Sequence, residues 1–129
     1  PGTGDTQLTF SQEIKMDGVI IVSTPQELAL QDVKRGIKMF DKLGVKIIGL
    51  IDNMSYFTGD DGKKYHIFGK GGVQKTAQEF KKEFLGEIPI NSEIGKQGDM
   101  GKPIVEKDPN HLISKIYIEL AKKIKLLYL

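Results

Sequence analysis

The sequence predicts an α/β fold with a mostly parallel sheet and helices on both faces. Two apolar runs, Val19–Ser23 and Val45–Ile51, are continuous rather than alternating, which is typical of parallel strands covered on both sides. Residues 27–43 between them have a helical apolar period and precede Gly44, which suits a helix end. The inward-facing residues of this helix are expected to be Leu28, Val33, Ile37 and Phe40. Together the three segments form a βαβ unit, whose crossover we expect to be right-handed.

The same patterns place the other elements. A third strand is expected at Phe84–Ile88, ended by Pro89, with a helix over Gly72–Lys82 before it. A short helix is expected at Gln7–Ile14, with Leu8 and Phe10 among its buried residues. The last helix is expected from near Pro109 to about Lys125.

Two stretches are expected to be irregular, residues 52–71 and residues 91–108. Each follows the carboxyl end of a predicted strand, where open α/β sheets bind their ligands. Three strands are also few for such a sheet, and they would leave an apolar strand at an edge with unpaired backbone groups. We therefore expect further strands of the same domain to precede Pro1.

Composition excludes several classes of function. The 129 residues suffice for one domain, and the net charge of +2 does not indicate a nucleic-acid or membrane surface. No apolar run approaches the roughly 20 residues that span a bilayer, and no signal peptide is visible, so a cytoplasmic protein is expected. There is no cysteine, hence no thiolate ligand. His66 and His111 lack ligand spacing, so no metal site is predicted and both are interpreted as surface or cap residues.

The segment Gly69–Thr76 is similar to a phosphate-binding loop, since Lys70 to Thr76 fit the pattern K-G-G-x-x-K-[ST]. However, Gln74 stands where a glycine usually precedes the lysine. The preceding residues, 66–68, are too few and too polar for a central strand. We interpret the segment as a glycine-rich turn that leads into a helix.

Five short motifs follow one another in a specific order. They are Pro1-Gly2-Thr3-Gly4-Asp5, Asp52-Asn53-Met54-Ser55-Tyr56-Phe57, Ile67-Phe68-Gly69-Lys70-Gly71-Gly72, Leu85-Gly86-Glu87-Ile88-Pro89-Ile90 and Gly101-Lys102-Pro103-Ile104-Val105. This set resembles the Mrp/ApbC family of P-loop ATPases, which are iron–sulfur cluster carriers related to MinD and ParA. The resemblance implies a three-layer P-loop NTPase fold, with residues 1–129 as the C-terminal part of one ATPase domain. Pro1–Asp5 would end a switch element, and the phosphate loop and Walker B strand would lie upstream.

The resemblance also assigns roles to individual residues. Asn53 matches the asparagine that hydrogen-bonds adenine, and a side-chain amide offers the donor and acceptor that a purine edge requires. Pro89, Ile90 and Asn91 match the stretch around the base and ribose. Asp5 matches a switch residue near the γ-phosphate or the dimer partner. Simpler interpretations stay open: a turn residue for Asn53, a strand end for Pro89 and a helix cap for Asp5.

The implied function of the complete protein is ATP hydrolysis with Mg²⁺, in a homodimer that passes iron–sulfur clusters to acceptor proteins. This chain alone is expected not to hydrolyse ATP, because it lacks the phosphate loop. Many members carry a C-x-x-C pair where this sequence has residues 58–65, which offer no thiolate for a cluster. The alternatives are a MinD/ParA-like regulatory or partitioning ATPase, and a non-enzymatic module that pairs through its exposed sheet edge.

Overall fold

A computed structural model describes residues 3–128. Three parallel strands, β1 (Val19–Ser23), β2 (Ile47–Thr58) and β4 (Phe84–Ile90), form the sheet with β2 in the middle. The two-residue strand β3 (Lys64–Tyr65) pairs antiparallel with the end of β2. The sheet is therefore mostly parallel, as the sequence predicts.

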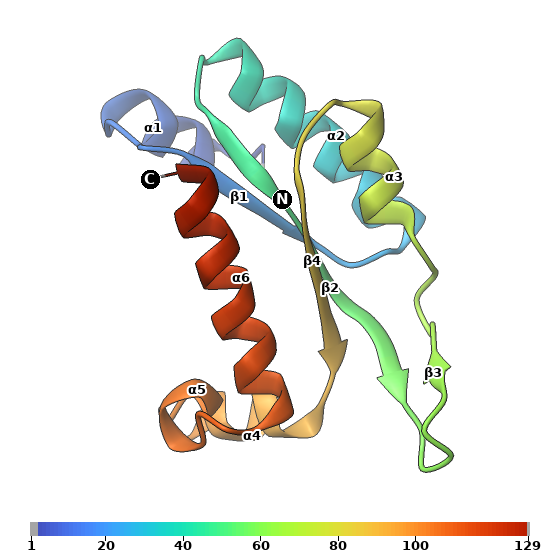
Figure 1. Ribbon diagram of the computed structural model, residues 1–129. Helices are drawn as coiled ribbons and strands as arrows, with labels where there is room; N and C mark the ends of the chain where they lie inside the picture. Colours follow the sequence, from blue (N-terminus) through green and yellow to red (C-terminus); the bar gives the residue numbers. More distant parts are fainter. Residues whose placement is uncertain (1–2, 129) are drawn as a thin grey trace.

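Helices cover both faces of this sheet (Figure 1). Helices α2 (Glu27–Lys42) and α3 (Gly72–Glu79) lie on one face, and α6 (Leu112–Tyr128) lies on the other. Helix α1 (Asp5–Glu13) precedes β1. The short helices α4 (Ser92–Asp99) and α5 (Ile104–Lys107) follow the carboxyl end of β4, the end at which the β2–β3 hairpin also projects. This arrangement confirms the predicted α/β class with three layers.

Each face of the sheet has its own hydrophobic core. On one face Leu50 of β2 packs with two residues from each of α2 and α3, namely Val33, Ile37, Val73 and Ala77. On the other face the next residue of β2, Ile51, packs with Leu85, Ile88 and Leu120. Successive side chains of a strand point to opposite faces, so a continuous apolar run is what two cores require.

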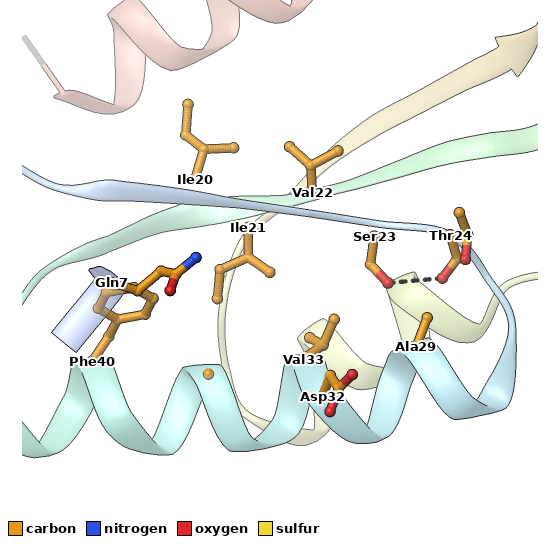
Figure 2. Close-up of a pocket in the computed structure, with 11 residues that line it drawn as sticks. Gln7, Ile20, Ile21, Val22, Ser23, Thr24, Ala29, Asp32, Val33 and Phe40 are labelled. Carbon is orange, nitrogen blue, oxygen red and sulfur yellow. Dashed lines mark hydrogen bonds between the residues drawn. The ribbon is translucent and has the colours of Figure 1, made fainter. Parts of the chain in front are cut away.

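Strand β1 is different, because one of its faces is not covered. Figure 2 shows Ile21 pointing toward α2 while Ile20 and Val22 point away from it. Ile20 is 36% exposed and Val22 is 55% exposed. A groove of about 430 Å³ follows this strand on the α2 side, and Gln7 of α1 also lines it.

Two expected core residues are wrong. Leu28 is 77% exposed, because it lies five residues before Val33, about 140° around the helix at 3.6 residues per turn. Phe10 is 55% exposed, and α1 buries none of its residues. The predicted end of α2 is confirmed, since Gly44 follows it with a left-handed φ of 69°.

The two stretches expected to be irregular are largely ordered. Strand β2 continues through residues 52–58 and returns as β3, and residues 91–108 contain α4 and α5. Strand β4 also continues through Pro89 to Ile90. It lies at the sheet edge, where a proline without an N–H is tolerated.

Two helix boundaries also differ from the prediction. Helix α3 ends at Glu79, because the chain turns at Lys81 with a φ of 54°. Helix α6 begins at Leu112 rather than near Pro109, since Asp108 first closes a turn by accepting a hydrogen bond from the N–H of Asn110 at 3.1 Å. Within residues 3–128, no helix combines the length and apolarity needed to cross a bilayer.

Candidate functional site

The carboxyl ends of β2 and β4 bring the predicted base-binding residues together. In the parallel pairing Asn53 is opposite Ile88 and Phe57 is opposite Ile90. Asn53 is half-buried, and Pro89 beside Ile88 is buried. Residues that are 36 positions apart in the sequence therefore share one corner of the sheet, as an open α/β sheet requires at a ligand site.

Asn91 adjoins this corner and also begins α4. Its side-chain Oδ1 accepts a hydrogen bond from the N–H of Glu93 at 2.9 Å, which is an N-cap. The cap fixes the chain direction directly after Ile90. Asn91 therefore holds the backbone of the corner in place, whatever its amide N–H groups contact.

Asp5 lies on a separate element, in the exposed first turn of α1. The N-cap of α1 is Gly4, and no side chain caps this helix, so the interpretation of Asp5 as a cap is wrong. Pro1 and Gly2, the first residues of the predicted switch segment, lie outside the described residues. A role for Asp5 near phosphate stays a prediction.

Asp52, directly before Asn53, is a buried carboxylate. It is 1% exposed, and neither of its oxygens has a hydrogen-bond partner among the described residues. Burial raises the pKa of Asp52 to about 6, Glu87 adds to the rise, and His66 opposes it. The Ser55 side chain is near enough to lower this pKa, yet its hydroxyl is also buried and unpartnered in the described structure.

The backbone between Asn53 and Phe57 is irregular. The pairing with β4 shifts register there, and Met54 has a φ of 55°. A non-glycine residue in this left-handed region is strained. Such strain persists only when the surrounding structure fixes it, and it concentrates at functional sites.

One side chain from β3's end contacts this irregular segment. The Nδ1 of His66 lies 3.1 Å from the carbonyl oxygen of Ser55, and its ring centroid lies 6.2 Å from that of Tyr56. His66 is half-buried and contacts the backbone of Ser55, a contact that its interpretation as a surface or cap residue did not include. His111 is a cap as interpreted, since its Nδ1 accepts from the N–H of Ile113 at 3.1 Å.

Sequence reasoning included Asp52, Met54 and Ser55 in a motif but gave them no role at this corner, and it did not connect His66 with it. One signal for them was available. Asp52 follows five apolar or glycine residues of the same strand. A carboxylate at the next position of a buried strand is unusual. The left-handed backbone of Met54 has no counterpart in the sequence, because methionine does not favour it.

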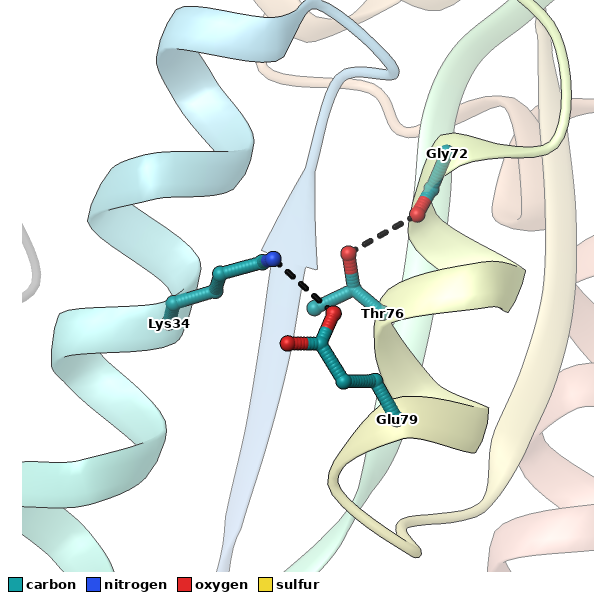
Figure 3. Close-up of polar contacts among 4 residues, drawn as sticks. All are labelled: Lys34, Gly72, Thr76 and Glu79. Carbon is teal, nitrogen blue, oxygen red and sulfur yellow. Dashed lines mark hydrogen bonds and ion pairs between the residues drawn. The ribbon is translucent and has the colours of Figure 1, made fainter.

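The glycine-rich segment before α3 has a packing explanation. A Cβ on Gly72 would come 2.6 Å from Leu30, and one on Gly69 would come 3.1 Å from the carbonyl oxygen of Pro25. The hydroxyl of Thr76 donates to the carbonyl of Gly72 at 2.9 Å (Figure 3). The strand before the segment is the two-residue β3, so the strand–loop–helix context of a phosphate loop is absent from this part of the described chain.

The tip of the β2–β3 hairpin is closed by Asp61. Its Oδ2 accepts from the Tyr65 hydroxyl at 2.6 Å and its Oδ1 accepts from the N–H of Lys63 at 2.9 Å. The hydrogen bond from Tyr65 lowers the pKa of Asp61. The sequence has no cysteine, and residues 3–128 contain no group of three potential metal ligands. The side chains at this hairpin tip therefore do not fit an iron–sulfur cluster.

Comparisons with known proteins agree with this geometry. A family profile described as a ParA-type "NUBPL iron-transfer P-loop NTPase" matches residues 1–125. An iron-sulfur cluster carrier protein of Aquifex aeolicus is 42% identical over 123 residues, 95% of this chain and 34% of its own length. The iron-sulfur cluster transfer protein NUBPL of Mus musculus is 43% identical over 125 residues, 96% of this chain and 39% of its own. The chain thus spans about two fifths or less of these relatives.

Solved structures show the same fold. A nucleotide-binding protein from Archaeoglobus fulgidus, in complex with ADP, superposes with a TM-score of 0.71 at 37% identity, covering 86% of this chain and 45% of its own. The cell division ATPase MinD of Pyrococcus furiosus has a TM-score of 0.69 at 21% identity, covering 94% and 45%, which supports the fold alone. The profile match and the identities confirm the resemblance, and the chain belongs to the ParA-type family of NUBPL iron-transfer P-loop NTPases.

Proposed function

We propose that residues 1–129 form the C-terminal part of an ATP-binding iron–sulfur cluster carrier and supply its adenine-recognition corner. The observation that carries this proposal is the meeting of Asn53 with Pro89–Asn91 at the carboxyl ends of two adjacent parallel strands. An amide at this position can both donate to and accept from a purine edge. The buried Pro89 and half-buried Ile90 would form the apolar wall against the base.

The phosphates of the nucleotide would be held by another part of the complete protein. The described residues offer no phosphate loop in its usual strand context, since the Gly69–Thr76 segment is a packed turn. We infer that the Walker A loop, the Walker B strand and the Mg²⁺ site belong to strands that pair with the free edge of β1. The exposed apolar side chains of Ile20 and Val22, on a face of β1 that the described residues leave open, support further elements of the domain beside this strand.

Hydrolysis in the complete protein would then depend on positioning and on electrostatic stabilisation of the phosphates. Asp5 would belong to the switch that responds to the γ-phosphate, and homodimerisation would complete the site. A cluster would be the cargo, passed to iron–sulfur acceptor proteins, with its thiolates supplied from outside residues 1–129. A cytoplasmic location is part of this proposal, although one relative of the family is designated mitochondrial.

The test measures nucleotide binding to the complete protein that carries this chain. Replacement N53A is expected to weaken ATP binding about tenfold, the loss of one or two well-aligned hydrogen bonds, while binding of inorganic triphosphate stays unchanged. The matched control is N110A, which changes a side chain for which no contact is described. Equal binding of ATP by the wild-type protein and N53A would contradict the proposed base contact.

Hydrolysis gives a second test, because the chain alone is expected to be inactive. Purified residues 1–129 should release no phosphate from Mg-ATP above the buffer rate. Phosphate release that disappears in a K75A variant would contradict the proposal, and it would make the Gly69–Thr76 segment a phosphate loop after all.

A further inference from the structure

The irregular backbone beside Asn53 is contacted by one side chain from another part of the hairpin, that of His66. We propose that His66 is a positioning residue for Asn53, acting through its contact with the carbonyl of Ser55. This inference rests on the proposed function, in which Asn53 recognises the base. It adds a residue from outside the two strand ends, and it links the hairpin to the nucleotide corner.

The segment that follows Asn53 has a strained backbone. Met54 holds a left-handed backbone between Asn53 and Ser55, and the pairing of β2 with β4 loses its register over the same residues. Relaxation of Met54 to an ordinary strand conformation would rotate the peptides on both sides of it. Because Asn53 is its neighbour, that rotation would redirect the Asn53 side chain.

The contact of His66 with the carbonyl of Ser55 opposes relaxation of the Met54 backbone. A carbonyl oxygen can only accept, so the 3.1 Å contact requires the proton of the His66 ring to lie on Nδ1. The bond holds the carbonyl of the peptide between Ser55 and Tyr56, one residue beyond Met54. It joins residues 11 positions apart, and Ser55 is the residue next to the strained Met54.

His66 is itself fixed in position by its backbone and by a neighbouring ring. Its backbone follows β3, which pairs with Phe57 and Thr58, and its carbonyl accepts from the N–H of Gly69 at 3.4 Å. The Tyr56 ring lies tilted by 60° to the imidazole, and the Lys64 ammonium lies 4.2 Å from the centre of the same Tyr56 ring. The backbone of His66 is therefore fixed by β3 and by Gly69, and its imidazole has an aromatic neighbour in Tyr56, which suits a positioning residue.

The contact of His66 should control selectivity between bases rather than overall affinity. Recognition of a base by an amide depends on the orientation of that amide, whereas phosphate contacts do not pass through Asn53. A misplaced Asn53 should therefore lower the preference for adenine over guanine without changing the affinity for the triphosphate. General loss of stability would instead weaken every ligand alike.

The experiment compares three replacements of His66 in the complete protein. H66A removes ring and donor, H66F keeps an aromatic ring without the donor, and H66N restores an N–H donor at the matching position. We expect H66A and H66F to lose about tenfold in the ratio of ATP to GTP affinity, the size of a lost oriented hydrogen bond, and H66N to recover most of it. K63A, an exposed side chain of the same hairpin, is the matched control and should change nothing.

An ATP to GTP ratio that stays at the wild-type value in H66A and H66F would overturn the inference, as would an equal loss for ATP, GTP and inorganic triphosphate. If the wild-type protein shows no preference for adenine, the proposed function itself fails. Amide hydrogen exchange then decides the role of His66. Faster exchange at Tyr56 and Phe57 in H66F, but not in K63A, would support the contact as the restraint on this segment, and unchanged exchange would overturn it.

Discussion

The two outer strands of the sheet, β1 and β4, differ in how far the described residues cover them. Along β4 the ammonium of Lys123 donates to the carbonyl oxygens of Phe84 and Leu85, both at 3.0 Å, so two backbone groups of this strand are already occupied. Along β1 the apolar side chains of Ile20 and Val22 are exposed, and a groove of about 430 Å³ follows the strand (Figure 2).

The difference indicates which of the two outer strands is the end of the sheet. A charged side chain and a proline are common means of blocking an edge strand, and β4 has both in Lys123 and Pro89. A strand of continuous Val and Ile is instead typical of a sheet interior. The comparison therefore supports the proposal that further strands join the sheet at β1 and that β4 is its natural end.

Truncation of a side chain of α6 that packs behind β4 and truncation of a side chain of β1 should have very different costs. L120A removes a side chain that is 7% exposed and packs behind β4, so we expect about 2 to 5 kcal/mol less free energy of unfolding. V22A truncates a side chain that is 55% exposed on β1, and it should cost no more than about 0.5 kcal/mol in this chain. Urea unfolding of both variants gives the values. Similar losses would mean that β1 is as well covered as β4.

The centre of the sheet offers the next largest effect, because Asp52 lies in register between Ser23 of β1 and Glu87 of β4. Its pKa is raised from 3.8 to about 6, so the folded state prefers the protonated form. The resulting penalty is absent below pH 4, grows between pH 4 and 6, and is constant above. We expect D52N to raise the free energy of unfolding at pH 8 by about 2 kcal/mol relative to the wild type, and to add nothing at pH 4.

The check is a pair of urea titrations, at pH 8 and at pH 4, for wild type and D52N. Comparison with D60N, an exposed neighbour on the hairpin, separates the burial of Asp52 from a simple change of net charge. A D52N variant that is less stable than the wild type at pH 8 would show that the ionised carboxylate is satisfied in solution.

The apolar runs predicted the fold because a strand that is buried on both faces requires a continuous run of apolar residues. Val19–Ser23 and residues 47–51 are strands for this reason, and the helical period of residues 27–43 gave α2 within one residue of its end. The continuation of β2 to Thr58 was missed, since its outer residues are polar, aromatic and exposed and their pairing depends on β3.

The candidate site could be predicted only in part. The motif order identified Asn53 and Pro89–Asn91, and the parallel register brings them together. Local spacing could not show that His66 would contact Ser55, because that contact depends on the hairpin register. Nor could it show that Asp52 would be unpartnered, which is a property of the packed sheet rather than of the strand.

A smaller effect should follow from opening the β4 edge. K123M keeps the length of the side chain but removes both hydrogen bonds to the edge carbonyls, so we expect a loss of about 1 kcal/mol in this exposed position. The same variant should self-associate more strongly, because the edge becomes available for pairing. K122M is the control, since the ion pair that Lys122 makes among residues 3–128 is with Glu119 of its own helix. Unfolding and sedimentation velocity measure the two effects, and equal behaviour of K122M and K123M would show that Lys123 does not block the edge.

The smallest effect is expected for the ion pair that joins the helix beside β1 to the helix before β4. Lys34 of α2 and Glu79 of α3 lie 2.8 Å apart (Figure 3), with 39% and 51% of their side chains exposed. Solvent screens such a pair and ordering two long side chains costs entropy, so a double-mutant cycle of K34A and E79A should give a coupling of about 0.5 kcal/mol. Added salt should reduce that coupling further. A coupling several times larger, unchanged by salt, would mean that this ion pair, rather than the apolar contacts of Val33, Ile37, Val73 and Ala77, holds α2 and α3 together over the sheet.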